Sequence, residues 1–185
     1  MKRSLAEKAM KMITAISAIG AILNILLYLV IGTGIWLSLA ITFGTIFYHF
    51  IMRLFVGISF NKWLRSLLNY KSKWFSEWRY EADFYRRIKI RKWKNKLPTY
   101  YPENFSMKRH SIDEMIQTMC IAELGHETMI VLSYLPLFLS AWFGMFYIFL
   151  LTSILAGLAD SIFVFVQRYN RNRLVKIAER GVDRA

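Results

Sequence analysis

Glu123 and His126 are the two residues whose types and spacing most directly suggest chemistry. At about 100° per residue, positions three apart on a helix lie about 60° apart and one turn from each other. Ser111 and Glu114 form a capping box, so we expect a helix to begin there. A carboxylate and an imidazole on a face expected to be buried suit a general base and the acid that orients it. They share that face with apolar residues at helical spacing: Ile112, Met115, Ile116, Met119 and Ile130.

Three functions are compatible with this pair. In the first, His126 is a general base and Glu123 or Glu127 orients its ring, with no metal bound. In the second, Glu123 and His126 are metal ligands, as Glu-x-x-His pairs are in di-metal helical bundles. The third is a non-catalytic, lipid-binding scaffold. Only one Glu-x-x-His pair is present. Further ligands would therefore have to come from Glu77, Glu81, Glu127, Asp160 and His49.

The chain is too apolar for an ordinary soluble domain of 185 residues, with 56% hydrophobic residues and a mean hydropathy of +0.32. Residues 13–52 contain no charged side chain, and Gly32-Thr33-Gly34 divides this run into two lengths close to a membrane span. A second run, residues 129–166, has Asp160 as its only charge, with a turn expected near residues 142–145 and a kink at Pro136. We therefore predict an all-α membrane protein with four transmembrane helices in two hairpins.

The predicted boundaries make the whole chain, residues 1–185, a single membrane domain. Its spans are expected at about 12–31, 35–56, 126–142 and 145–167. Residues 58–125 form a segment with amphipathic interfacial helices on the cytoplasmic side. Within it, residues 60–95 interleave aromatic and basic side chains, as helices at a lipid headgroup surface do, and Leu97-Pro98 is expected to end that helix.

The positive charges predict the orientation. They gather before the first span, between residues 62 and 109, and after the last span, while the two expected outer turns carry none. Both termini and the interfacial segment should therefore face the cytoplasm of a multi-pass protein. This bias and attraction to anionic lipid account for the net charge of +13 without nucleic acid as a partner. The single cysteine, Cys120, excludes an internal disulfide and fits a reducing face.

Polar residues near the ends of the spans are further candidates for binding. His49 and Arg53 are four apart, so they share a helix face and are candidates for handling an anion. Asp160 lies about 12 Å deeper than Arg168 along a continuous helix. A carboxylate at that depth either binds substrate or pairs with a polar group of another span. The exit of the last span, residues 167–174, adds amides and a tyrosine to its arginines, which favours hydrogen bonding to a phosphate or sugar headgroup.

Three blocks together resemble one family. They are residues 90–98 (IRKWKNKLP), residues 122–126 (AELGH) and residues 167–174 (QRYNRNRL). With them, the chain over about residues 60–175 resembles the glycosyl-4,4'-diaponeurosporenoate acyltransferase family of bacterial carotenoid biosynthesis. Asn172 stands where members of that family often carry proline.

The resemblance implies an acyltransferase of the bacterial cell membrane that acts at the cytoplasmic interface. It implies a glycolipid acceptor, such as a glycosylated carotenoid acid, and an acyl thioester donor, either acyl-CoA or an acyl carrier protein, with no bound cofactor. His126 would deprotonate the acceptor hydroxyl, with Glu123 or Glu127 behind it. The residues expected to bind the two substrates are Gln167, Arg168, Tyr169, Asn170, Arg171, Arg173, Lys92, Trp93, Lys94, His49, Arg53 and Asp160.

Overall fold

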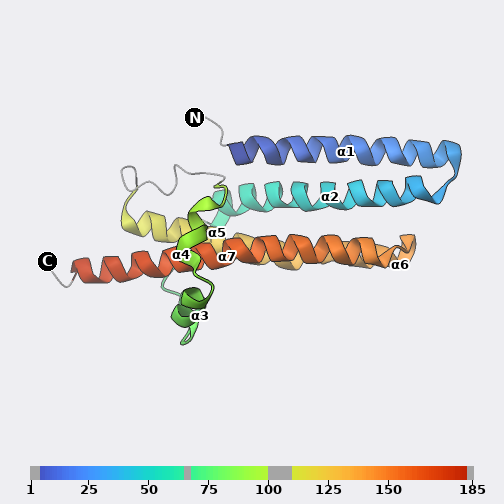
Figure 1. Ribbon diagram of the computed structural model, residues 1–185. Coiled ribbons are helices and arrows are strands. Elements are labelled where there is room, and N and C mark those ends of the chain that lie inside the picture. Colours follow the sequence, from blue (N-terminus) through green and yellow to red (C-terminus); the bar gives the residue numbers. More distant parts are fainter. Residues whose placement is uncertain (1–4, 65–67, 100–109, 183–185) are drawn as a thin grey trace. The chain divides into compact units, whose positions relative to one another are not determined.

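The structure is a computed structural model that describes residues 5–64, 68–99 and 110–182, and every regular element within those ranges is helical (Figure 1). Four of its helices are long and apolar enough to cross a membrane: Leu5–Ile31, Gly34–Leu64, Ile112–Phe143 and Phe146–Arg180. The prediction of an all-α chain with four such helices is confirmed. The chain divides into two compact units, residues 1–56 with 127–161 and residues 57–126 with 162–185, which are described in turn.

The first unit begins with α1 (Leu5–Ile31) and α2 (Gly34–Ser59). Gly32 has a φ of 75°, a left-handed conformation that glycine adopts without strain, so the chain turns at the predicted Gly-Thr-Gly break. The second turn also lies where the sequence places it. There α6 (Ser140–Phe143) ends at Gly144 and α7 (Phe146–Val182) begins, with positive φ at both Gly144 and Met145.

Pro136 has a larger effect than the predicted kink. The α-helix α5 (Ile112–Leu132) stops four residues before it, and Leu135–Leu139 form a turn of 3-10 helix, η5. Proline lacks the N–H that would bond to the carbonyl four residues earlier, and its ring clashes with that carbonyl. The backbone therefore changes its helix type at Pro136 instead of bending as one continuous α-helix.

Gly20 allows α1 to approach α2 closely. A Cβ at this position would lie 2.6 Å from the nearest ring carbon of Phe43, which is shorter than any allowed contact. We expect Gly20→Ala to destabilise the protein by about 1–3 kcal/mol, the usual cost of overpacking. Gly44→Ala is the control, because a Cβ there meets nothing within 4 Å. Unfolding in mixed detergent micelles measures both, and equal stability of the two variants would contradict the close approach.

The second unit is built on the first fifteen residues of α5. The predicted capping box is present, since the Glu114 N–H donates to Ser111 Oγ at 3.2 Å and the Ser111 N–H donates to Glu114 Oε2 at 3.0 Å. Four residues of the predicted stripe are buried, Met115, Ile116, Met119 and Glu123, whereas Ile112, His126 and Ile130 are half-buried. The core at this stripe consists of Met115, Ile116, Met119 and Cys120 of α5 with Phe75 and Leu174.

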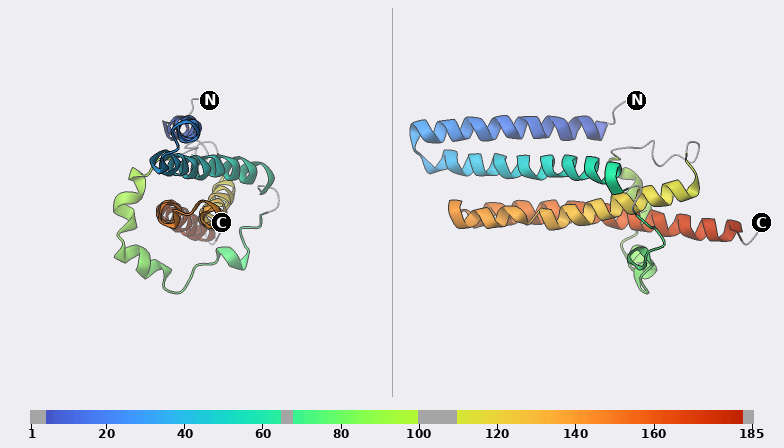
Figure 2. Two further views of the ribbon diagram at one scale, coloured as in Figure 1. Left: turned by 90° about the vertical axis from the view of Figure 1, so that its right-hand side faces the viewer. Right: turned by 180° about the vertical axis from the view of Figure 1, so that it is seen from behind.

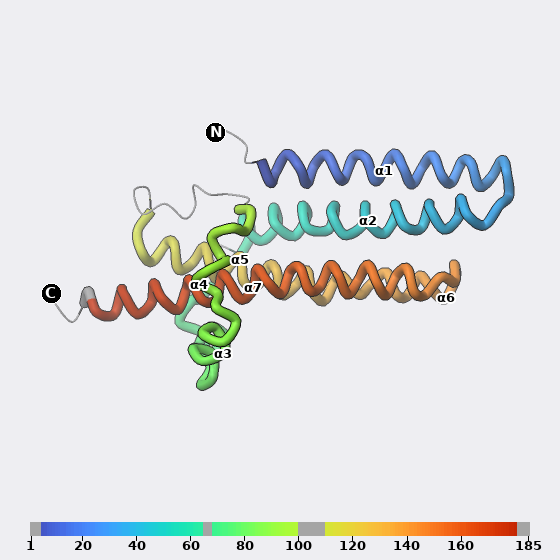
Figure 3. The backbone as a smooth tube through the Cα atoms, in the orientation of Figure 1, coloured from blue at the N-terminus to red at the C-terminus, as the bar shows by residue number. Residues whose placement is uncertain are grey.

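Residues 68–97, which we call the wrapping segment, curve around the C-terminal half of α7 (Figures 2 and 3). They do not form the long helix predicted over residues 60–95, and residues 65–67 and 100–109 of the predicted interfacial region lie outside the described residues. Lys89, with a φ of 51°, separates two of the short helices. Before the wrapping segment lies η1 (Phe60–Leu64, a π-helical turn). The wrapping segment itself contains η2 (Lys73–Phe75), α3 (Glu81–Arg87), α4 (Ile90–Trp93) and η3 (Lys94–Lys96).

Candidate functional site

Glu123 is fully buried in the second unit and is paired with two arginines of α7. Its Oε2 accepts a hydrogen bond from Arg171 Nε at 2.9 Å, and Arg171 Nη2 lies 3.4 Å from Oε1. Arg168 Nη1 also donates to Oε1, at 3.3 Å. Glu123 is 0% exposed and Arg171 only 2%. The carboxylate on the predicted stripe therefore holds α5 against α7 through a buried ion pair.

A second buried carboxylate, Glu81, binds the other side of Arg168. Its Oε1 lies 3.3 Å from Arg168 Nε and accepts from Tyr85 Oη at 2.7 Å and from Asn172 Nδ2 at 2.9 Å. Its Oε2 accepts from the backbone N–H of Trp78 at 2.9 Å. Burial, and then the hydrogen bond to Glu81, raise the pKa of Tyr85, so this phenol stays a donor. Arg168 thus lies between two carboxylates.

The same arginines also hold the wrapping segment to α7. Arg171 Nη1 donates to the carbonyl oxygen of Phe75, and Arg168 Nη2 donates to that of Ser76 at 3.2 Å. These carbonyls lie at the end of the short helix η2, where they would otherwise lack a helical partner. We name this set of contacts, centred on Glu81, Glu123, Arg168 and Arg171, the arginine–glutamate network.

Two other cations lie over the ring of Tyr169, and Arg91 is a third positive charge close enough to act on Lys94. Lys94 Nζ lies 5.4 Å from the ring centroid and Arg173 Cζ lies 5.8 Å from it, and Lys94 Nζ also donates to Asn170 Oδ1 at 2.6 Å. Burial, Arg173 and Arg91 all lower the pKa of Lys94, which shows that positive charges are crowded there. Within the described residues no carboxylate pairs with these three cations. We name Arg91, Lys94 and Arg173 the cation cluster.

His126 is half-buried on α5, and its ring is stacked on that of Phe163, with ring centroids 4.9 Å apart and planes 11° from parallel. Gln167 follows Phe163 by one turn of α7, so the two side chains share a helix face. The Oε1 atom of Gln167 is buried and has no hydrogen-bond partner among the residues described. His126 therefore lies against an aromatic ring with an incompletely bonded amide on the same face of α7.

The first unit brings together three more of the predicted residues, His49, Arg53 and Asp160. Arg53 Nη2 donates to Asp160 Oδ2 and, at 3.1 Å, to the carbonyl of Ala156, while Nη1 donates to the carbonyl of His49 at 2.7 Å. Asp160 pairs with a cation of another helix, one of the two roles that its depth predicts. His49 is 4% exposed, and neither ring nitrogen has a hydrogen-bond partner in the described part of the chain.

The remaining candidates have separate surroundings. Trp93 donates from Nε1 to the carbonyl of Ile88 at 2.9 Å and packs beside the core of Tyr85, Ile90 and Val166. Lys92 is exposed and Glu127 is half-buried. The described residues contain no group of three or more His, Cys, Asp or Glu side chains placed to hold a metal ion.

Sequence reasoning did not identify Tyr85 or Phe163 as parts of these sites, and it named Glu81 only as a possible metal ligand and Asn172 only within residues 167–174. Glu81 and Tyr85 carry one local signal, because a spacing of four places them on one helix face. The partner of Glu81 is almost ninety residues away, so its pairing with Arg168 has no local signal. Asn172 occupies the position at which members of the resembled family often carry proline. Its side-chain amide donates to Glu81, a hydrogen bond that proline cannot make.

One of three comparisons with known proteins found a match. A search of curated proteins and a search of solved structures found no match. The family model described as glycosyl-4,4'-diaponeurosporenoate acyltransferase matches residues 71–180, more than half of the chain. The matched range contains the whole arginine–glutamate network, the cation cluster and His126. By this match, the chain belongs to the glycosyl-4,4'-diaponeurosporenoate acyltransferase family.

Proposed function

We propose that this protein is a membrane acyltransferase that moves a fatty acyl group from a thioester donor to a hydroxyl of a membrane glycolipid. The acceptor class is taken from the family description, which names a glycosylated carotenoid acid. The observation that carries the proposal is the family match, because it includes a half-buried histidine and a buried polar network in one continuous range. The four apolar helices are proposed to form two transmembrane hairpins, with both termini and the site at the cytoplasmic face.

His126 is the proposed general base. A sugar hydroxyl is a weak nucleophile, so a group within hydrogen-bond reach must accept its proton as the oxygen attacks the thioester carbonyl. The imidazole then returns the proton to the departing thiolate, and an oxygen ester replaces the thioester. Stacking on Phe163 fixes the plane of the ring. Gln167, one turn from Phe163, is the proposed donor to the oxyanion of the tetrahedral intermediate, with Tyr169 and Asn170 as neighbouring donors.

Glu123 is proposed as a positioning residue. Both of its oxygens are engaged by Arg168 and Arg171, so its charge is balanced without the imidazole. It lies one turn before His126 and holds that part of α5 against α7. Arg168 and Arg171 thereby stabilise the site indirectly, because they hold Glu123 and this part of α5 in place.

The cation cluster is the proposed site for phosphate groups of an acyl-CoA or of the prosthetic group of an acyl carrier protein. Its side chains come from α4, η3 and α7, and no carboxylate among the described residues pairs with them. An anion bound there would offset the repulsion from Arg173 and Arg91, which adds to burial in lowering the pKa of Lys94. Arginine and lysine bind phosphate through charge-assisted hydrogen bonds.

Replacing His126 with alanine tests the assignment. We expect the rate of acyl transfer to fall by about 10²–10⁴-fold, the usual contribution of a general base. The measurement is mass spectrometry of the product lipid formed by proteoliposomes that contain the protein, a fatty acyl-CoA and a glycosylated carotenoid acid. His110→Ala is the matched control, because His110 pairs with Glu114 at 3.5 Å outside the proposed site.

His126→Gln separates a base from a scaffold. Glutamine keeps hydrogen-bonding capacity but cannot accept the proton, so a catalytic histidine loses activity in both variants. If either variant folds and keeps the wild-type rate, the assignment of His126 as the base is wrong. Elution from a sizing column and thermal unfolding verify the fold of each variant.

A further inference from the structure

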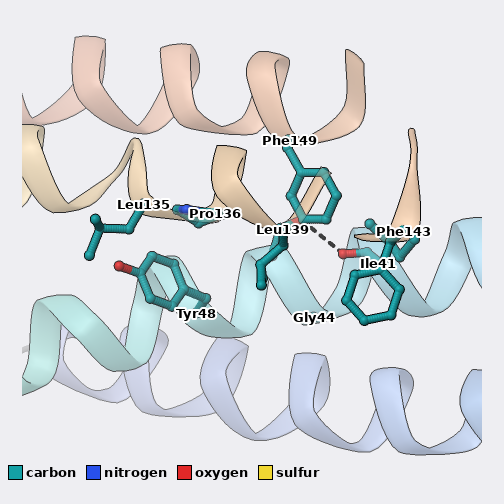
Figure 4. A pocket seen from close by; sticks show the side chains of 9 residues that line it. Ile41, Gly44, Tyr48, Leu135, Pro136, Leu139, Phe143 and Phe149 are labelled. Atoms are coloured by element: carbon teal, nitrogen blue, oxygen red, sulfur yellow. Dashed lines mark hydrogen bonds between the residues drawn. The ribbon is translucent and has the colours of Figure 1, made fainter. Parts of the chain in front are cut away.

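The first unit contains an apolar pocket between α2, η5, α6 and α7 (Figure 4). Its volume is about 410 Å³, within the range of roughly 300–1,000 Å³ typical of ligand pockets. The helices that line it are among those apolar enough to span a membrane. The lining residues are Ile41, Gly44, Thr45, Tyr48, Leu135, Pro136, Leu139, Phe143 and Phe149.

Two unpartnered polar groups lie beyond one end of this pocket. His49 is one turn after Thr45 on α2, and Ser153 is one turn after Phe149 on α7. Both are buried, and both ring nitrogens of His49 and the hydroxyl of Ser153 lack a hydrogen-bond partner in the described residues. A buried polar group without a partner costs about 1–3 kcal/mol. Such groups call for an explanation, and a bound ligand supplies one.

The contacts of Arg53 place these groups at the same level of the two helices. Arg53, one turn beyond His49, bonds to the carbonyl of Ala156 and to Asp160, so it fixes the register of α2 against α7. The two helices run in the same direction (Figure 1). Along this direction an apolar pocket comes first, then unpartnered hydrogen-bonding groups, and then an ion pair.

We infer that this pocket binds the hydrocarbon chain of an amphiphilic ester, with its ester carbonyl accepting a hydrogen bond from His49. A neutral imidazole carries one N–H donor, and the serine hydroxyl supplies another. Arg53 is already paired with Asp160, so a carboxylate would find no free cation there and would be repelled by Asp160. The polar end of the ligand is therefore neutral.

The ligand class follows from the proposed function, on which its identity rests. A glycosylated carotenoid acid has a long hydrocarbon chain, a neutral ester carbonyl and a sugar, in the order that the pocket and its polar end require. The pocket anchors the acceptor by its chain, and the ester that joins chain and sugar lies beside His49. The acyl donor is bound elsewhere.

Photo-crosslinking of the full chain in lipid nanodiscs tests this inference without any turnover. The probe is a glucosyl ester of a long-chain fatty acid with a diazirine near the end of its chain. We expect it to label the peptides that contain residues 41–48 or 135–149. Gly44→Leu should reduce labelling at least tenfold, because its side chain occupies the pocket and a Cβ there meets nothing within 4 Å. Gly57→Leu is the matched control, on the same helix but outside the lining and equally free of clashes.

A separate variant tests the hydrogen bond from His49 to the ester. In this test an unlabelled glucosyl ester competes with the diazirine probe for the pocket. His49→Leu should weaken that competition about tenfold, the value of one to two hydrogen bonds, and leave competition by an alkane of equal length unchanged. Because His49 has no hydrogen-bond partner to lose, this variant is expected to fold. Labelling that is insensitive to Gly44→Leu, or equal labelling by the free fatty acid or by an acyl-CoA with the same chain, would overturn the inference.

The outcomes separate this inference from the proposed function. Pocket labelling by a wild-type protein that transfers no acyl group would support the pocket and contradict the function. Acyl transfer by a wild-type protein that shows no pocket labelling would contradict the pocket alone.

Discussion

Replacing Glu123 with alanine is expected to lower the free energy of unfolding by about 3–5 kcal/mol, because the change leaves a buried charge without its partner. Arg171 is 2% exposed and makes its side-chain ion pair with Glu123, so water cannot replace the lost carboxylate without opening the packing of α5 on α7. Acyl transfer should fall with it, since His126 is one turn along the same helix. Denaturation in mixed micelles, followed by circular dichroism, measures the change in stability.

Glu77→Ala is the matched control for this prediction. Glu77 also joins the wrapping segment to α7, through Lys176 at 2.6 Å, but both side chains of that pair are partly exposed. Exposed ion pairs contribute about 0–1 kcal/mol. Equal losses of stability in Glu123→Ala and Glu77→Ala would show that the buried network does not hold the second unit together. Glu123→Gln, which keeps hydrogen-bonding oxygen but removes the charge, should lie between the wild type and Glu123→Ala.

The helix boundaries are largely predictable because local chemistry sets them. A glycine at positive φ ends α1, and a serine and a glutamate three residues apart cap α5. Part of the burial on α5 also follows from the residues alone, because Met115, Ile116 and Met119 of the predicted stripe are buried, but Thr118, Cys120 and Ile121 are buried too. Each of these signals lies within a few residues of the feature that it determines.

The path of the wrapping segment is not predictable in the same way. Its aromatic and basic residues suggest a single interfacial helix, but partners distant in sequence hold it in short pieces. Glu81 pairs with Arg168, and the carbonyl of Phe75 accepts from Arg171. Such contacts override local helical preference, because a buried arginine must satisfy its donors wherever acceptors lie.

Residues 167–174 of α7 illustrate a related difficulty. Their arginines suggest a surface for phosphate or sugar, and composition does not distinguish a guanidinium that faces solvent from one that is buried. Arg171 is buried against Glu123, whereas Arg173 lies beside Tyr169 in the cation cluster. Two positions along the helix turn a side chain by about 200°, so neighbouring arginines of one motif serve different roles.

Replacing Asp160 with alanine is the second change expected to have a large effect, again a loss of about 3–5 kcal/mol. The carboxylate is almost fully buried and pairs with Arg53, whose side chain is also mostly buried. Without Asp160, a guanidinium remains among apolar helices that have no water to solvate it. Unfolding in mixed micelles measures the loss, and Asp83→Ala provides the comparison, because Asp83 pairs with Arg86 at 2.8 Å with both side chains exposed and should cost less than about 1 kcal/mol.

The double variant Arg53→Met with Asp160→Leu determines what this pair does. Removing both charges avoids the uncompensated guanidinium, so stability should return to near the wild-type value. If binding of the glucosyl ester returns as well, the ion pair only joins α2 to α7. If stability returns while binding of the ester does not, and binding of the free fatty acid increases, the charge of Asp160 selects a neutral ligand. Failure of the double variant to recover stability would show that Arg53 acts mainly through the carbonyls of His49 and Ala156, to which it also donates.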